Sequence, residues 1–211
     1  IYPNKRIDFT TIDNLNPDIY ISKKKQIDRA LNPRIIKSHE KVTSLYPKVI
    51  YIYRDPRDVA ISYYYWFKKF KKNKEISFDE FFKIYLDGEL SFGSWLEHVN
   101  GWLEKEKQFP DRILSVRYED MKNDTFNNLL EILRFCNIKK PNDDLSSAIE
   151  KSSFKNMKKI EKDTEYISFL KNTDHSIKFV RSGKSEWYKV MTCRQKKDII
   201  NKFSPLIDQY L

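Results

Sequence analysis

The sequence predicts an α/β fold in which helices flank a parallel β-sheet. Residues 48–53, with the sequence KVIYIY, form the best strand, because they are β-branched or aromatic with little polar alternation, as in a sheet covered on both faces. Residues 112–118 form a second segment of this kind. Long stretches with helical spacing follow both segments, and short buried strands that alternate with long helices are typical of a layered α/β fold with a parallel sheet.

Composition predicts one domain over residues 1–211, because 40% hydrophobic content at this length is enough for a core. No apolar run approaches the roughly 18 residues of a membrane span. The net charge of +10 predicts an anionic partner, which leaves nucleic acid, a membrane surface and a phosphorylated small molecule open. Two cysteines without a metal-binding spacing predict reduced thiols in a cytoplasmic protein, and four glycines leave neither a G-x-G-x-x-G turn nor a Walker P-loop.

The first half of the chain begins with an irregular lead-in, residues 1–33, in which we expect at most one short helix. Residues 34–37 resemble a short strand. After residues 48–53, Asp55 is a good N-cap and Pro56 a good first helical residue, so a helix is expected from Pro56 to about Lys72.

Two further helices are expected to begin at S-x-x-E capping boxes, Ser77 with Glu80 and Ser94 with Glu97. Residues 126–135 keep helical spacing after the second strand. Helical patches follow at residues 145–151, 154–159 and 192–207, and Pro205 is expected to bend or end the last of them.

Arg54 directly follows the best strand, where open parallel sheets bind their ligands. Ser62 lies about two helical turns further on, so Arg54 and Ser62 together have the chemistry of a phosphate clamp. The alternative is an arginine paired with a carboxylate such as Asp55 or Asp58, and a serine on a solvated face.

His39 follows the short strand 34–37, whose last residue is Lys37, and alternation along a strand would point both side chains to one site. A near-neutral imidazole suits proton removal from a hydroxyl, and an ammonium suits developing negative charge. The alternative for a single histidine is a structural role, and this is the expected role of His98 and His175.

Six segments in order between residues 37 and 187 resemble the cytosolic sulfotransferases. Residues 37–39 resemble that family's K-T-H segment, and residues 48–67, KVIYIYRDPRDVAISYYYWF, resemble its strand-loop-helix for the 3′-phosphate of the sulfonate donor. Residues 90–104, 116–124, 152–159 and 179–187 are similar to its Y-G-S-W-x-x-H-V, Y-E-D-M-K, T-S-F-K-x-M-K and F-x-R-K-G segments. The resemblance implies a three-layer sheet like that of the P-loop NTPases and transfer of a sulfonate group from 3′-phosphoadenosine 5′-phosphosulfate to the hydroxyl of a small acceptor, without a metal.

The resemblance also implies a role for particular residues. The 3′-phosphate would be held by Arg54, Ser62, Arg181 and Gly183, and the adenine by Tyr118, Ser153 and Phe154. His39 would be the general base and Lys37 a contact to the 5′-phosphosulfate. The implied mechanism is in-line attack of the acceptor hydroxyl on the sulfur.

The sequence departs from the family in three places. The family's first strand and its Y-P-K-S-G-T-T-W loop are not found in these residues. We expect them upstream of Ile1, and residues 1–211 alone to be weak or inactive; the alternative is a chain that is defective in donor binding. Ser182 replaces the Lys of the R-K-G segment, and Lys184 is a candidate to compensate. Residues 189–192 match the family's dimer motif poorly, which favours a monomer or weak dimer.

Two other functions stay open at this point. One is a relative without activity that still binds the nucleotide. The other is a basic nucleic-acid-binding module, suggested by the lysine-rich residues 68–74 and 155–162, although the chain has no reader motif and solvated faces explain both runs. The aromatic residues 63–67, 81, 82 and 85 line either an apolar acceptor pocket or the core, with the core favoured. Trp95 and Trp102 are expected to pack in the core.

Overall fold

The computed structural model describes residues 7–9, 11–20, 22–28, 33–43, 46–70, 73–163, 173–174 and 176–210. The helices are α1 (Ile12–Leu15), α2 (Lys24–Asp28), α3 (Pro56–Lys69), α4 (Phe78–Asp87), α5 (Trp95–Gln108), α6 (Tyr118–Asn123), α7 (Thr125–Phe135), α8 (Asn142–Lys151), α9 (Phe154–Asp163), α10 (Trp187–Val190) and α11 (Cys193–Tyr210), and the strands are β1 (Val49–Tyr53) and β2 (Ile113–Arg117). In this part of the chain, no helix is long and apolar enough to cross a membrane.

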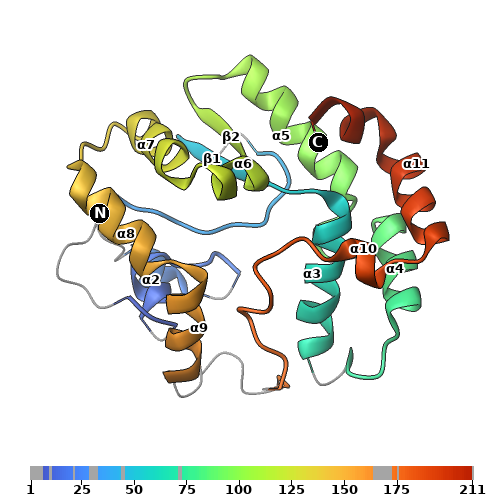
Figure 1. Cartoon of the computed structure of the whole chain (residues 1–211). Helices are drawn as coiled ribbons and strands as arrows, with labels where there is room; N and C mark the ends of the chain where they lie inside the picture. Colours follow the sequence, from blue (N-terminus) through green and yellow to red (C-terminus); the bar gives the residue numbers. More distant parts are fainter. Residues whose placement is uncertain are drawn as a thin grey trace.

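A parallel sheet of β1 and β2 is flanked by helices, as the sequence predicts. The register pairs Val49 with Ile113 and Tyr53 with Arg117, so both strands end at the same edge. In Figure 1, α7, α8 and α9 lie to one side of the sheet, and α3, α4, α10 and α11 lie to the other. A connection through helices between parallel neighbours is the usual α/β arrangement.

One expectation for the sheet is wrong in the described part of the chain. Residues 48–53 were expected to be covered on both faces, but Ile50 is 37% and Ile52 is 49% exposed. Strand residues alternate between faces. Tyr51 stacks on Trp102 of α5, so Ile50 and Ile52 point to the opposite face, where the described elements leave them open.

The core lies mainly among α3, α4, α5 and α11. Its buried residues are Ala60, Ile61, Tyr64, Phe81, Phe82, Tyr85, Leu90, Trp95, Val99, Leu103, Met191, Ile199, Phe203, Leu206 and Ile207. The aromatic residues for which an acceptor pocket was the alternative therefore belong largely to the core. Trp95 and Trp102 are buried as expected, at 7% and 3% exposure.

Two of the three helix starts expected from capping residues have the expected caps. Asp55 caps α3 by accepting the backbone N–H of Arg57, and Ser77 and Glu80 form the expected capping box. Ser94 makes no side-chain cap, and Glu97 of the same expected box pairs with Lys41 at 3.3 Å.

Four other expectations need correction. Residues 34–37 form no strand; only Lys37 pairs, in an isolated bridge with Asp18. The lead-in contains two short helices, α1 and α2. The helix after β2 begins at Tyr118 and is divided into α6 and α7 at Asp124, whose side chain caps α7. Finally, α11 continues past Pro205 to Tyr210, so Pro205 does not end this helix.

Candidate active site

Arg54 and Tyr118 meet at the edge of the sheet because they follow two paired parallel strands. The register places Tyr53 beside Arg117, so the next residue of each strand lies at the same edge. The guanidinium carbon of Arg54 lies 4.5 Å from the ring centroid of Tyr118. The structure thus brings together two residues predicted from distant parts of the sequence.

Arg54 also has carboxylate neighbours. Its Nη2 lies 3.2 Å from Asp58, and its Nε lies 3.8 Å from Glu119. The sequence left open whether Arg54 pairs with Asp55 or Asp58. Arg54 pairs with Asp58, whereas Asp55 pairs with Arg57. Arg54 Nε is buried and has no hydrogen-bond partner among the described residues, which leaves one donor of a planar fork for an additional acceptor.

A hollow of about 140 Å³ opens at this edge. It is lined by Arg54, Asp58, Tyr118, Glu119, Lys122, Asn123, Gly183 and Ser185. Complete ligand pockets usually have about 300–1,000 Å³, so this hollow is smaller than a complete ligand pocket. Sequence analysis did not identify Lys122 and Asn123 as site residues, although they lie in the same family-like segment as Tyr118.

Gly183 and Phe154 form one wall beside this hollow. Gly183 has a φ of +65°, and a Cβ atom there would lie 2.6 Å from Cδ2 of Phe154. Only glycine fits this close approach of backbone to ring. Phe154 is 36% exposed, and Ser153 before it accepts a 3.4 Å hydrogen bond from the backbone of Asn156 at the start of α9. The cation, the spare donor and the aromatic rings fit an adenosine phosphate.

Arg181 lies along α3 rather than among the residues that line the hollow. Its guanidinium lies 3.2 Å from Glu186 and 4.5 Å from the ring centroid of Tyr65. The backbone N–H of Glu186 donates to Asp58 at 3.3 Å. Asp58, Ser62 and Tyr65 are spaced i, i+4 and i+7, so residues 181–186 follow the face of α3 that carries the exposed Ser62.

Two charged side chains that the sequence did not single out fix the segment before Arg181. Lys69 is 5% exposed and donates to the carbonyls of Asp174, at 3.3 Å, and Ile177. Burial lowers the pKa of Lys69. Glu161 of α9 accepts the backbone N–H groups of Phe179 and Val180 at 2.6 and 3.1 Å. A solvated face therefore does not explain Lys69 in the lysine-rich run 68–74.

His39 and Lys37 lie near each other but are not among the residues that line the hollow. Lys37 Nζ pairs with Asp18 at 3.0 Å, and the His39 ring lies 5.1 Å from the ring of Phe92. Partial burial, followed by the nearby Lys37 ammonium, lowers the pKa of His39, which favours a neutral imidazole. Residues 34–37 form no strand, so alternation along a strand does not set the directions of these two side chains.

The other two histidines, His98 and His175, were expected to have structural roles. His98 lies on α5, its ring Nδ1 is 2.9 Å from the hydroxyl of Tyr51, and burial lowers its pKa. His175 lies outside the described residues. In the described part of the chain, no group of three or more His, Cys, Asp or Glu residues is arranged to hold a metal ion.

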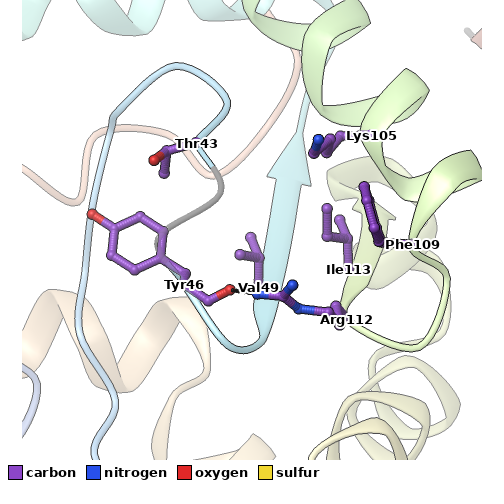
Figure 2. A pocket seen from close by; sticks show the side chains of 7 residues that line it. All are labelled: Thr43, Tyr46, Val49, Lys105, Phe109, Arg112 and Ile113. Atoms are coloured by element: carbon purple, nitrogen blue, oxygen red, sulfur yellow. Dashed lines mark hydrogen bonds between the residues drawn. The ribbon is translucent and has the colours of Figure 1, made fainter.

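A second, smaller hollow of about 40 Å³ lies at the opposite end of the strands (Figure 2). Val49 and Ile113, the first residues of β1 and β2, form part of its lining. The guanidinium of Arg112 donates to the carbonyls of Tyr46 and Pro47 and so holds residues 46–47 beside this hollow. Its size is too small for a nucleotide.

The chain belongs to the sulfotransferase family, because residues 5–210 match the model of the sulfotransferase domain. It is 35% identical over 175 residues to sulfotransferase 1 family member D1 of Mus musculus, a match that covers 78% of this chain and 58% of the mouse protein. It is 33% identical over 177 residues to sulfotransferase 1A1 of Bos taurus, over 78% of this chain and 59% of the bovine protein. The chain thus spans less than two thirds of the length of these relatives.

Solved structures support the same fold. A retinol dehydratase in complex with androsterone and inactive cofactor PAP superposes with a TM-score of 0.73 at 21% identity, over 86% of this chain and 55% of the other. Mouse sulfotransferase SULT7A1 complexed with PAP gives a TM-score of 0.63 at 24% identity, over 75% and 57% of the two chains. The predicted α/β fold and family are confirmed.

Proposed function

We propose that this protein transfers a sulfonate group from 3′-phosphoadenosine 5′-phosphosulfate to a hydroxyl group of a small acceptor. The observation that carries the proposal is the hollow at the carboxyl edge of the sheet, where Arg54, whose buried Nε makes no hydrogen bond with the described residues, lines the wall together with Tyr118 and Gly183. Its chemistry suits an adenosine phosphate, and two family members solved with PAP share the fold.

The donor-binding roles follow from the chemistry of these residues. Arg54 and Arg181 supply guanidinium groups for the 3′-phosphate, together with Ser62 and the backbone at Gly183. Aromatic faces suit a purine, and the residues proposed to hold the adenine are Tyr118, Ser153 and Phe154. Lys122, which lines the hollow, adds a third cation.

The transfer step needs a base and charge stabilisation but no metal. The acceptor oxygen attacks sulfur, an O–S bond forms, and the bond from sulfur to the bridging phosphate oxygen breaks. His39 takes the hydroxyl proton, for which its lowered pKa keeps the imidazole neutral. Lys37 stabilises the charge on the phosphosulfate. In this structure Lys37 pairs with Asp18, so we propose that its ammonium exchanges this carboxylate for the donor.

A nucleotide-binding relative without activity is the second candidate. It is favoured by one observation, that the described lining of the hollow includes neither Lys37 nor His39. The wider proposal includes a cytoplasmic location and a monomer or weak dimer. Retinol and androsterone appear in structures of a related retinol dehydratase, which makes small apolar alcohols the first acceptors to test.

The experiment is a thermal-shift and calorimetric titration with adenosine 3′,5′-bisphosphate, followed by transfer assays with labelled donor on the full-length protein. The bisphosphate is expected to stabilise the protein, and an alcohol or phenol to become labelled. Binding without transfer to any acceptor would favour the inactive relative. Stabilisation only by an oligonucleotide, lost at higher salt, would overturn both in favour of nucleic-acid binding.

A further inference from the structure

One face of α5 carries three ring N–H groups that reach backbone carbonyls in distant parts of the chain. Trp95, His98 and Trp102 are spaced i, i+3 and i+7, which places them on one side of a helix. Trp95 Nε1 donates to the carbonyl of Arg54 at 3.1 Å. Trp102 Nε1 donates to the carbonyl of Glu40 at 3.2 Å.

His98 completes this row and reaches the carbonyl of His39 at 3.2 Å through Nε2. A carbonyl can only accept, so Nε2 carries the proton. In the neutral ring, Nδ1 is then the acceptor for the hydroxyl of Tyr51, 2.9 Å away. Burial lowers the pKa of His98 and so favours this neutral form. The two contacts together select one tautomer.

The carbonyls held in this way have no partner in regular secondary structure. Arg54, His39 and Glu40 lie in irregular segments between helices and strands. Two of them belong to the residues proposed to bind the phosphate and to take the proton. A single rigid helix therefore contacts the backbone on both sides of the proposed site.

Packing along α5 supports the same arrangement. Tyr51 of β1 stacks on both His98 and Trp102, with ring centroids 5.6 and 5.7 Å apart. Gly101 leaves room for Val42, whose Cγ1 would lie 3.4 Å from a Cβ atom at that position. Segment 39–42 therefore lies directly against α5, and the side chain of His39 is left exposed beside it.

We propose that Trp95, His98 and Trp102 are positioning residues that hold the base-bearing segment at a fixed place relative to Arg54. They act through the backbone carbonyls of Arg54, His39 and Glu40. Trp95 sets the phosphate side, and His98, as its Nε2–H tautomer, sets the base side together with Trp102. The functional meaning of this arrangement rests on the proposed transfer reaction, whereas the tautomer and the order of segment 39–42 do not.

The first test measures the tautomer of His98 by nitrogen NMR on the labelled full chain. A protonated Nε2 and an unprotonated Nδ1 are expected at neutral pH. The opposite tautomer, or fast exchange between the two, would overturn the proposal whether or not the protein is a sulfotransferase.

The second test removes single donors. Trp102→Phe and His98→Leu keep an apolar side chain but lose the N–H, and we expect amide hydrogen exchange in segment 39–42 to rise about 2- to 10-fold, which corresponds to one lost hydrogen bond. His98→Gln retains an amide donor near the Nε2 position and should restore most of the protection. Unchanged exchange in Trp102→Phe would overturn the proposal.

The third test separates the two sides. Trp95→Phe should weaken binding of adenosine 3′,5′-bisphosphate about 2- to 10-fold and leave the NMR titration of His39 unchanged. Trp102→Phe should do the reverse, and in the transfer assay it should lower kcat with little change in KM for the donor. Leu103→Ala, which removes buried packing from the same helix but no donor, is the control. If all three variants move both readouts in proportion to lost thermal stability, the role is packing and the proposal is wrong.

Discussion

The phosphate side and the base side of the proposed site are held by different kinds of contact. On the phosphate side, charged side chains pair with each other: Arg54 with Asp58, and Arg181 with Glu186, whose N–H reaches Asp58. On the base side, the backbone of His39 is held by a ring donor while its side chain stays exposed. A bound phosphate must compete with carboxylates on one side, whereas on the other the imidazole of His39 contacts the ring of Phe92 and no carboxylate is paired with it among the described residues.

This difference separates affinity from turnover. Changes among the paired charges should alter nucleotide binding, because these groups would contact the phosphate. Changes at the base should alter the chemical step and leave the nucleotide in place.

The largest expected effect is that of His39→Ala on turnover. Loss of the general base should lower kcat by ~10²–10⁴-fold in a transfer assay on the full-length protein. Affinity for adenosine 3′,5′-bisphosphate, measured by calorimetry, should stay within about twofold. A variant with close to full rate would show that His39 is not the base.

Arg54→Ala should act on affinity instead. Loss of charge-assisted hydrogen bonds is typically worth about 1.5–3 kcal/mol, or about 10- to 150-fold in the dissociation constant of the bisphosphate. Asp58 and Glu119 would then also repel the phosphate. Arg57→Ala is the matched control, because this nearby guanidinium pairs with Asp55, stacks on Trp187 and is not among the residues that line the hollow. Equal losses of affinity in both variants would argue against a specific phosphate site at Arg54.

Gly183→Ala should have a smaller effect. A Cβ atom at a φ of +65° is strained by about 1–3 kcal/mol, and it would also clash with Phe154. Bisphosphate affinity should therefore fall about tenfold, as the loop shifts to relieve the clash. Gly101→Ala is the control, since its Cβ would make ordinary contact with Val42 in a helix where alanine is favoured. If Gly183→Ala bound normally, the loop would not be part of the site.

The smallest expected effect is a loss of stability in mild acid. The pKa values of His39 and His98 both lie below the usual 6.5. Below about pH 6.5 the unfolded chain therefore binds more protons than the folded chain. The free energy of unfolding decreases as the pH falls through this range, and the stability that depends on neutral histidines is fully present only above about pH 6.5. Urea denaturation between pH 5.5 and about 7.5 measures this slope. His98→Gln should reduce it, and an unchanged slope would show that His98 is not held neutral by the fold.

Several elements were predictable because their causes lie within a few residues along the chain. The apolar run of β1, the Asp55–Pro56 start of α3 and the Ser77–Glu80 capping box each depend on near neighbours. The matching box at Ser94 shows the limit of this reasoning. Glu97 has a partner 56 residues away, Lys41, and local spacing cannot anticipate that competitor.

The candidate site was predictable in part for the same reason. Parallel strands end at one edge, which places Arg54 beside Tyr118. The apparent strand before His39 was wrong, because its backbone partners lie in residues 17–19 and form only an isolated bridge. The burial of Lys69 could not be foreseen either, since its carbonyl partners lie more than 100 residues away in sequence.

The sequence by itself determined the parallel α/β arrangement and the family, and it predicted the residues proposed for the phosphate side, because these depend on short-range patterns and on the order of motifs. Only the tertiary structure decided what Trp95, His98 and Trp102 do. Their ring donors meet carbonyls 41, 59 and 62 residues away. The sequence marks Trp95 and Trp102 as core residues and His98 as structural, and it is the packing of α5 against the irregular segments that brings their N–H groups to these carbonyls.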